Sequence, residues 1–153
     1  MFYTKSAKYA IQTMIYLAIK ENQGLVMVSE IANAYHISQS FLSKITRTLR
    51  KYNLIKSTRG RNGGIKLAKS KDLIFISDIL LAIDGPESIE PKCIFGYESC
   101  SETQPCPFHY RWKDVIVQIR DLMETETLGS LSADVMERNY LPGIKEFIPD
   151  LLN

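Results

Sequence analysis

Apolar residues recur at helical spacing through the first third of the chain. Ala7, Ile11, Met14 and Ala18 lie three to four positions apart and predict an amphipathic helix over residues 5–20. A second, short helix is predicted over about 28–35. A tight turn at 36–38 then leads into a third helix over about 39–52, for which Ser38 is the predicted N-cap. The apolar face of this third helix consists of Leu42, Ile45, Leu49 and Tyr52.

The pattern next changes to that of short strands. Residues 54–58 and 65–68 are two strand candidates, and the six residues between them read Arg-Gly-Arg-Asn-Gly-Gly. Glycine and asparagine tolerate positive φ, so this segment predicts a hairpin loop. Residues 73–76 are predicted to be extended. Ser77 is the predicted cap of a helix over about 78–84, which ends at Gly85.

The second half of the chain divides into a loop, a long helix and a tail. Residues 86–107 contain four prolines and all three cysteines, and are predicted to be irregular. A long helix follows over about 108–125, and a shorter one is expected around 131–138, after Gly129. We therefore predict four segments, 1–85, 86–107, 108–140 and 141–153, with the last a flexible tail. The long helix carries an apolar seam formed by Trp112, Val115, Ile116, Ile119, Leu122 and Met123.

The net charge of +2 conceals a strong division along the chain. Residues 1–71 hold 13 lysines and arginines against Glu21 and Glu30, a net charge of +11. Residues 72–153 hold 6 basic against 15 acidic residues, a net charge of −9. A basic half joined to an acidic half indicates that the first half binds a polyanion.

Other features of the composition limit where the protein acts. No apolar run is long enough to span a membrane, and the first residues lack the pattern of a secretory signal. Three cysteines, an odd number, exclude a full disulfide framework and favour a reducing compartment. We therefore expect a cytoplasmic protein with no membrane partner.

Three short helices followed by a glycine-tipped hairpin predict a mainly α fold with a small β-hairpin wing, a winged helix-turn-helix. In this fold the helix after the tight turn enters the major groove of DNA. Its outward face is rich in hydroxyls, an amide and cations, which bond base edges or phosphates, and it has no acidic residue. Arginines of the wing can enter a narrow minor groove. The candidate DNA-binding residues are Ser38, Gln39, Ser40, Ser43, Lys44, Arg47 and Lys51 of the helix, and Arg59, Gly60, Arg61 and Asn62 of the wing.

The three cysteines form a second candidate site. Cys93, Cys100 and Cys106 have the spacing C-x6-C-x5-C, and His109 follows three residues later. This differs from the paired C-x2-C of a zinc ribbon or a redox dithiol. Three thiolates beside a helix start can hold an iron–sulfur cluster, for which His109 is the candidate fourth ligand. A thiol redox switch and a zinc site are the alternatives.

The stretch from Ser6 to Gly85 resembles the Rrf-two family of bacterial winged-helix regulators, and the resemblance continues to about residue 138. The matching residues are Tyr9-Ala10, the run from Ile37 to Leu42, Leu49-Arg50-Lys51, the wing from Arg59 to Gly64, and the segments from Ile76 to Ile79 and Asp84-Gly85. The resemblance implies a DNA-binding transcription regulator rather than an enzyme.

The resemblance extends to the cysteine loop. Members that bind a cluster carry three cysteines in this loop, usually spaced C-x5-C-x5-C, one residue shorter in the first gap than here. Members that regulate iron–sulfur supply use a histidine three residues after the last cysteine as a [2Fe–2S] ligand, which corresponds to His109. The wing from Arg61 to Ile65 is closer to the branch that senses nitric oxide. The implied cofactor is thus an iron–sulfur cluster, with [2Fe–2S] favoured and [4Fe–4S] open.

The resemblance also implies a homodimer that forms through the seam of the long helix and reads a pseudo-palindromic operator. We therefore expect a regulator that senses redox state, nitric oxide or iron–sulfur status. One rival is a cluster-free regulator of the same fold with a thiol switch. Another is a small redox protein, although such a protein has no need of a strongly basic half.

Overall fold

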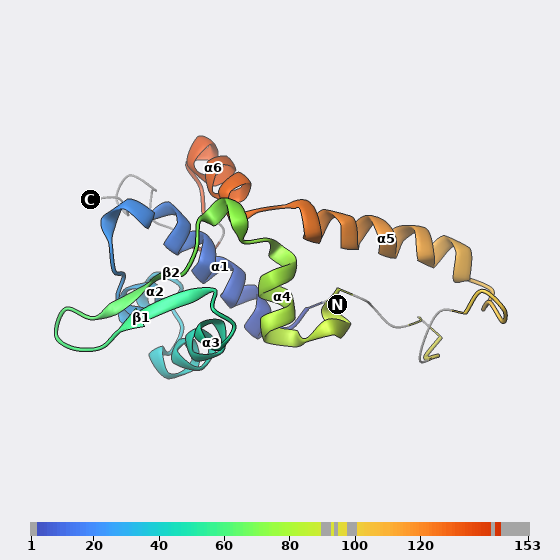
Figure 1. Ribbon diagram of the computed structural model, residues 1–153, viewed down its shortest axis with the longest axis horizontal. Coiled ribbons are helices and arrows are strands. Elements are labelled where there is room, and N and C mark those ends of the chain that lie inside the picture. The colour runs from blue at the N-terminus through green and yellow to red at the C-terminus, as the bar shows by residue number, and fades with distance from the viewer. Residues whose placement is uncertain (1–2, 90–92, 94, 98–100, 142, 145–153) are drawn as a thin grey trace.

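The computed structural model describes residues 3–89, 93, 95–97, 101–141, 143 and 144. A body of short helices and one hairpin carries a single long helix that projects from it (Figure 1). The α-helices are α1 (Lys5–Ile19), α2 (Val28–Ala34), α3 (Gln39–Lys51), α4 (Ile76–Asp84), α5 (His109–Thr125) and α6 (Leu128–Arg138). Short 3₁₀ turns occur at Glu21–Gln23 (η1), Lys71–Leu73 (η2) and Pro86–Ser88 (η3), and the strands are β1 (Ile55–Thr58) and β2 (Gly64–Leu67).

The predicted helices of the body are confirmed, and their apolar faces meet in one core. Met14 of α1, Ile31 of α2, Leu42 of α3 and Ile79 of α4 are each completely buried. Tyr52 is an exception to the prediction. It is 52% exposed because it is the C-cap of α3 and no longer follows the helical face.

The turn between α2 and α3 fixes where α3 begins. His36 adopts a left-handed conformation, with φ 53°, which lets the chain reverse direction sharply. Ser38 is the N-cap of α3, as predicted, and its Oγ accepts the backbone N–H of Phe41 at 3.3 Å. Such caps contribute about 1 kcal/mol to helix stability.

The helix α4 begins earlier than predicted, and Ser77 is not its cap. Asp78 lies in the first turn and accepts the backbone N–H of Phe75 at 3.1 Å, so Phe75 is the N-cap. Ser77 lies inside the helix and is buried. Leu73, predicted to be extended, belongs instead to η2, where Ser70 accepts the N–H of Asp72.

The helix α6 packs back onto the body and includes Gly129, where a break was expected. Thr127 caps it by accepting the N–H of Ser130 at 3.1 Å. Gly129 lies against Asp72 of η2, and a Cβ at position 129 would force the carboxylate of Asp72 to move. The start of the predicted flexible tail is also held, since Leu141 and Ile144 are 1% and 4% exposed and belong to the core. Residues 142 and 145–153 of that tail lie outside the described residues.

Two single-residue bridges connect the body in ways that the hydrophobic pattern does not predict. Val26 pairs with Ile65 of β2, so one residue of a third strand flanks the hairpin. Phe75 pairs with Thr127 through the hydrogen bonds from Ile76 N to Glu126 O, 3.0 Å, and from Leu128 N to Ile74 O, 2.8 Å. The second bridge fastens the C-terminal end of α5 to the start of α4.

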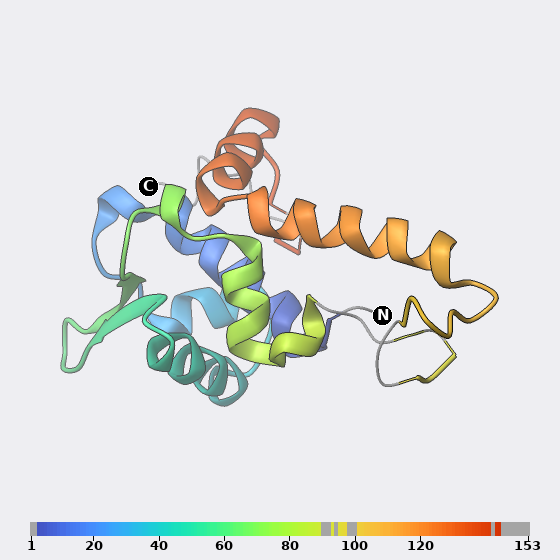
Figure 2. The same cartoon turned by 45° about the vertical axis from the view of Figure 1, so that its right-hand side comes forward.

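The long helix and the hairpin extend in opposite directions from the body (Figures 1 and 2). The described residues of the cysteine loop lie at the N-terminal end of α5, the end that is remote from the body. The two features singled out by the sequence, the basic hairpin and the cysteine loop, are therefore at opposite ends of the molecule.

Candidate nucleic-acid interface and metal centre

The helix α3 turns one face to the core and its predicted DNA-binding face to solvent. Leu42, Ile45 and Leu49 are at most 4% exposed. The opposite face has no acidic residue, and its polar and basic side chains project from the body. Ser38, Gln39, Ser40, Lys44, Arg47 and Lys51 are exposed, and Ser43 is half-buried.

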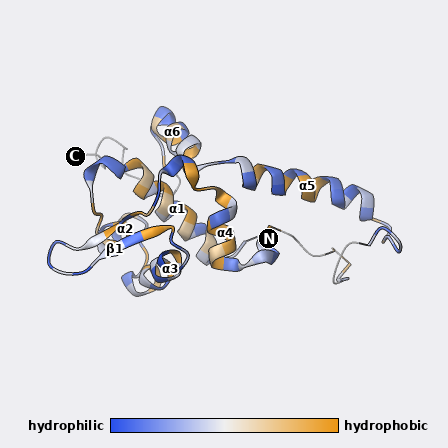
Figure 3. Ribbon diagram, in the orientation of Figure 1, coloured by the Kyte–Doolittle hydropathy of each residue, from blue (hydrophilic) through white to orange (hydrophobic). Residues whose placement is uncertain are grey.

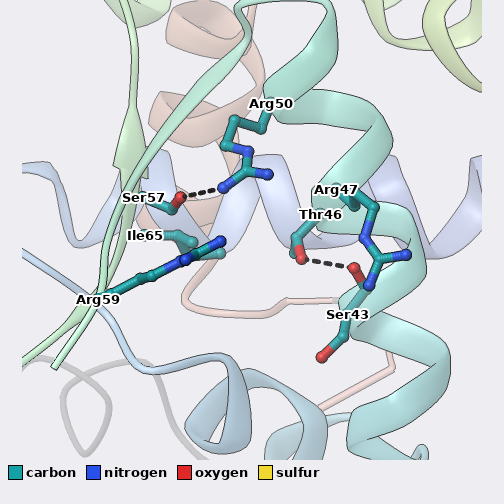
Figure 4. Close-up of a pocket in the computed structure, with 7 residues that line it drawn as sticks. All are labelled: Ser43, Thr46, Arg47, Arg50, Ser57, Arg59 and Ile65. Atoms are coloured by element: carbon teal, nitrogen blue, oxygen red, sulfur yellow. Dashed lines mark hydrogen bonds between the residues drawn. The ribbon is translucent and has the colours of Figure 1, made fainter.

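A recess of about 200 Å³ separates α3 from the hairpin, and three arginines line it (Figure 4). Arg50 reaches from α3 toward β1, where its Nη1 donates a hydrogen bond to Ser57 Oγ at 3.1 Å. Arg59 points from the hairpin toward α3. The lining residues are Ser43, Thr46, Arg47, Arg50, Ser57, Arg59 and Ile65.

Sequence reasoning missed Arg50, Ser57 and Thr46 as members of this surface. Strand alternation was the available signal for Ser57. It lies two positions from the buried Ile55, so both face the same side of β1. Arg50 follows Arg47 by three positions, one helical turn along α3.

The loop of the hairpin keeps its arginines exposed at the tip. Gly60 has φ +112°, a conformation that side chains rarely adopt. Its carbonyl accepts the N–H of Gly63 at 3.0 Å, and a Cβ at Gly63 would collide with the carbonyl oxygen of Thr58. Arg59, Arg61 and Asn62 are all exposed, as a DNA-contacting wing requires.

The positive charge of this surface is not neutralised within the described part of the chain. The two acidic residues of the basic half are engaged elsewhere: Glu30 with Lys20 at 2.7 Å and Glu21 with Lys71 at 3.7 Å. The cations of α3 and the wing form no ion pair with any described residue; these are Lys44, Arg47, Arg50, Lys51, Arg59 and Arg61. The surface can therefore offer its charge to a polyanion.

The cysteine loop brings two of its three sulfur atoms close together. The Sγ atoms of Cys93 and Cys106 are 3.9 Å apart, with Cys93 buried and Cys106 half-buried. Cys100 lies outside the described residues. Over the described residues, no three histidine, cysteine, aspartate or glutamate side chains converge closely enough to hold a metal ion.

The environment of His109 is compatible with its predicted role as a metal ligand. It begins α5, its backbone N–H donates to Cys106 O at 3.0 Å, and its side chain is only 2% exposed. Its Nε2 is buried and makes no hydrogen bond in the described part of the molecule. A buried ring nitrogen without a hydrogen bond is costly, and coordination to a metal would satisfy it. Thiolate and imidazole are donor types that iron–sulfur clusters take as ligands, so the residue types of Cys93, Cys106 and His109 are compatible with such a cluster.

A carboxylate stands beside His109. Glu102 Oε1 lies 3.8 Å from His109 Nε2 and accepts a hydrogen bond from the ammonium group of Lys113. That hydrogen bond and the charge of Lys113 hold the pKa of Glu102 below its usual value, so the carboxylate is ionised. Glu102 was not among the predicted site residues.

The described residues cover the apolar seam of α5 only in part. Val115 and Leu122 are 45% and 53% exposed, and Trp112, Ile116, Ile119 and Met123 are half-buried. Met123, near the C-terminal end, packs against the core. Figure 3 shows apolar positions along α5 beyond its first turns, which are hydrophilic. None of the described helices is long and apolar enough to cross a membrane.

Three short helices, a hairpin wing and an exposed basic α3 define a winged-helix DNA-binding protein. The chain belongs to the Rrf2 family, described as iron-dependent transcriptional regulators, whose model matches residues 3–134. The resemblance stated from the sequence is thereby confirmed. The protein is a transcription regulator and not an enzyme, because its relatives are regulators of transcription.

Relatives of two kinds are found. The HTH-type transcriptional regulator IscR of Sodalis glossinidius is 32% identical over 140 residues, which are 88% of this chain and 84% of that protein. The solved structure of T. potens IscR is 26% identical, with a TM-score of 0.72 and coverage of 90% of each chain. CymR (YrzC), the global cysteine regulator of B. subtilis, is also 26% identical, with a TM-score of 0.75 and coverage of 86% of this chain and 95% of that one.

Proposed function

We propose that α3 and the hairpin loop form the operator-binding surface of this regulator. The observation that carries this proposal is the recess between α3 and the hairpin, lined by Arg47, Arg50 and Arg59 and flanked by uncompensated cations. Arg47 and Gln39 of α3 would meet a major groove, and Arg59 and Arg61 of the loop would reach the adjacent minor groove, Arg59 by turning away from the recess that it lines. The remaining hydroxyl and lysine side chains of α3 bind phosphates of the DNA backbone.

The operator-binding unit is a homodimer that forms through α5. Its seam is apolar and lies on a helix that leaves the body, and the described residues cover it only in part. A second copy of the same helix would cover both seams by a two-fold arrangement. Two α3 helices then read the two halves of a pseudo-palindromic operator.

The cysteine loop is the sensor of this regulator and holds an iron–sulfur cluster. Cys93, Cys100 and Cys106 would supply three thiolates, and His109 the fourth ligand, consistent with the relatives named IscR. When bound, the cluster supplies iron whose charge and ligands change with redox state or nitric oxide. The loop stands at the start of α5, and the end of α5 is hydrogen-bonded to the start of α4. A change of the loop on cluster binding can therefore alter the orientation of the DNA-binding body relative to α5.

A thiol switch without a cluster is the second candidate. It is favoured by the 3.9 Å separation of Cys93 and Cys106 sulfur atoms and by the likeness to CymR. The S. aureus CymR has been solved in an oxidized form, 28% identical to this chain with a TM-score of 0.70. In this alternative, oxidation of the thiols themselves changes DNA affinity.

A single experiment separates the two sensors. Protein purified without oxygen is analysed for iron and acid-labile sulfide, and its operator is selected from a random-sequence duplex pool. The cluster proposal expects both elements, and an affinity or sequence preference that differs by about 5- to 150-fold between the cluster-loaded and apo forms. Protein without iron whose binding changes reversibly with peroxide and dithiothreitol supports the thiol switch. Binding that responds to neither treatment contradicts the sensor proposal.

The dimer is tested by placing lysine at two neighbouring positions of α5. Leu122→Lys introduces a charge into the exposed seam, whereas Asp121→Lys introduces it on the opposite side of the helix. Sedimentation velocity is expected to show a monomer for Leu122→Lys and a dimer for Asp121→Lys. Operator affinity should fall at least tenfold in the monomeric variant, because two half-sites are then bound independently. Equal dimerisation of both variants contradicts the assignment.

A further inference from the structure

A second basic surface lies on the face of the hairpin that is turned away from α3. Lys56 of β1 and Lys66 of β2 are directly opposite each other in the antiparallel pair, and both are exposed. Ser57 and Ile65 are the next pair, and they line the recess on the α3 side. Because side chains alternate along a strand, the two lysines project from the other face.

This lysine pair is unfavourable for the isolated fold. Like charges directly opposite each other destabilise a hairpin. Neither lysine has an ion pair with any described residue, since Glu21 is paired with Lys71 and Asp78 with Lys69. Lys56, Lys66 and Lys69 together line a recess of about 300 Å³ that the end of α1 and Gly24 close on the other side. Of these three lysines only Lys69 has an ion pair, with Asp78, so the charges of Lys56 and Lys66 have no ion-pair partner among the described residues.

We infer that Lys56 and Lys66 bind backbone phosphates of the duplex beyond the operator half-site. The inference rests on the proposed operator-binding surface, because it extends that surface across the same hairpin. A duplex that meets α3 and the arginines of the loop continues past the hairpin, and it presents a phosphate charge about every 1.7 Å along its axis. The face behind the hairpin is where the flanking phosphates would lie.

The composition of the surface favours DNA over an acidic protein. Protein interfaces concentrate aromatic and apolar anchors at their centre. The recess behind the hairpin has no aromatic residue, and its charged residues are Glu21, Lys56, Lys66 and Lys69. Lysines on a two-stranded ribbon suit phosphates, which need point charges rather than a shaped pocket.

The test compares two duplexes that share one selected operator. The first ends at the outer edge of the half-sites, and the second adds about 10 base pairs of arbitrary sequence, one helical turn, on each side. The wild-type protein is expected to bind the longer duplex more tightly. Lys56→Gln/Lys66→Gln should lose about fivefold to twentyfold in affinity for the longer duplex only, and its salt dependence there should decrease by about two phosphate contacts. Arg138→Gln, which removes one exposed positive charge from α6, controls for loss of charge away from the hairpin, at half the change in net charge of the double variant.

The outcomes distinguish this inference from the proposed function. Failure of the wild-type protein to bind either duplex contradicts the operator-binding surface itself. Equal binding of both duplexes by wild type, or an equal loss on both by the lysine variant, contradicts the flank contact alone. If the variant binds both duplexes as wild type does, the flank contact is likewise contradicted, and an acidic protein is the occupant to test next. Thermal unfolding is expected to be unchanged or shifted upward in the variant, because a repulsive pair has been removed.

Discussion

Arg47→Ala is expected to weaken binding of the selected operator by about tenfold to a hundredfold while leaving the fold intact. Arg47 lies at the centre of the exposed face of α3, lines the recess beside the hairpin and has no ion pair with a described residue. An arginine that forks onto a guanine contributes about 1–3 kcal/mol of discrimination. Competition binding at fixed salt measures the loss.

The conservative variant decides what Arg47 contacts. Lysine keeps the charge but cannot form the two parallel hydrogen bonds of a guanidinium group. If Arg47 contacts a base, the Arg47→Lys variant also binds the operator weakly, and its preference for one base pair of the operator is reduced. If Arg47 contacts a phosphate, Arg47→Lys recovers binding, and Arg47→Ala lowers the salt slope by about one contact. Wild-type affinity in Arg47→Ala contradicts the placement of α3 on DNA.

Replacing any one of the three cysteines with alanine is expected to remove most of the iron and the visible absorption of anaerobically purified protein. Each thiolate that is lost leaves the cluster short of a ligand and open to solvent. His109→Ala should have a smaller effect, a less stable cluster with an altered spectrum and potential, because three thiolates remain. Iron content, absorption and EPR spectra are the measurements.

The chain supplies a matched control for the histidine. His36 is the second histidine, exposed in the turn between α2 and α3, and remote from the loop. Asparagine tolerates its left-handed conformation, so His36→Asn should keep the wild-type iron content and spectrum. A wild-type spectrum in His109→Ala would assign the fourth ligand to another residue. Glu102, 3.8 Å from Nε2, is then the first to test, by Glu102→Gln.

The body of the fold could be predicted because its signals are local. Met14 and Leu42 recur at helical spacing with their neighbours, and Ser38 caps the segment that follows it in the chain. The cap of α4 was predicted wrongly because the helix begins at Ile76, before Ser77. The carboxylate of Asp78, in the first turn, accepts the N–H of Phe75 and so makes Phe75 the N-cap. Competing caps a residue or two apart cannot be ranked from sequence alone.

What escaped prediction depends on contacts between distant segments. The pairing of Phe75 with Thr127 joins a segment that was predicted to be extended to a residue whose own surroundings carry no strand pattern. In the same way, Arg50 joins the candidate interface only because the hairpin brings Ser57 against α3. The outward face of α3 was predictable from helical periodicity. The burial of His109 was not, because His109 is the one buried residue of an otherwise exposed or half-buried helix and helical periodicity gives no signal for it.

The attachment of α5 at one end makes it a lever. A helix of 17 residues is about 25 Å long, so a tilt of about 10° at the junction with α4 moves its far end by about 4 Å. In the opposite direction, a rearrangement of an ångström or so in the cysteine loop reaches the junction only as a small rotation. The far end of α5 therefore transmits an angle rather than a displacement, and in the proposed dimer two such angles would set the distance between the two α3 helices.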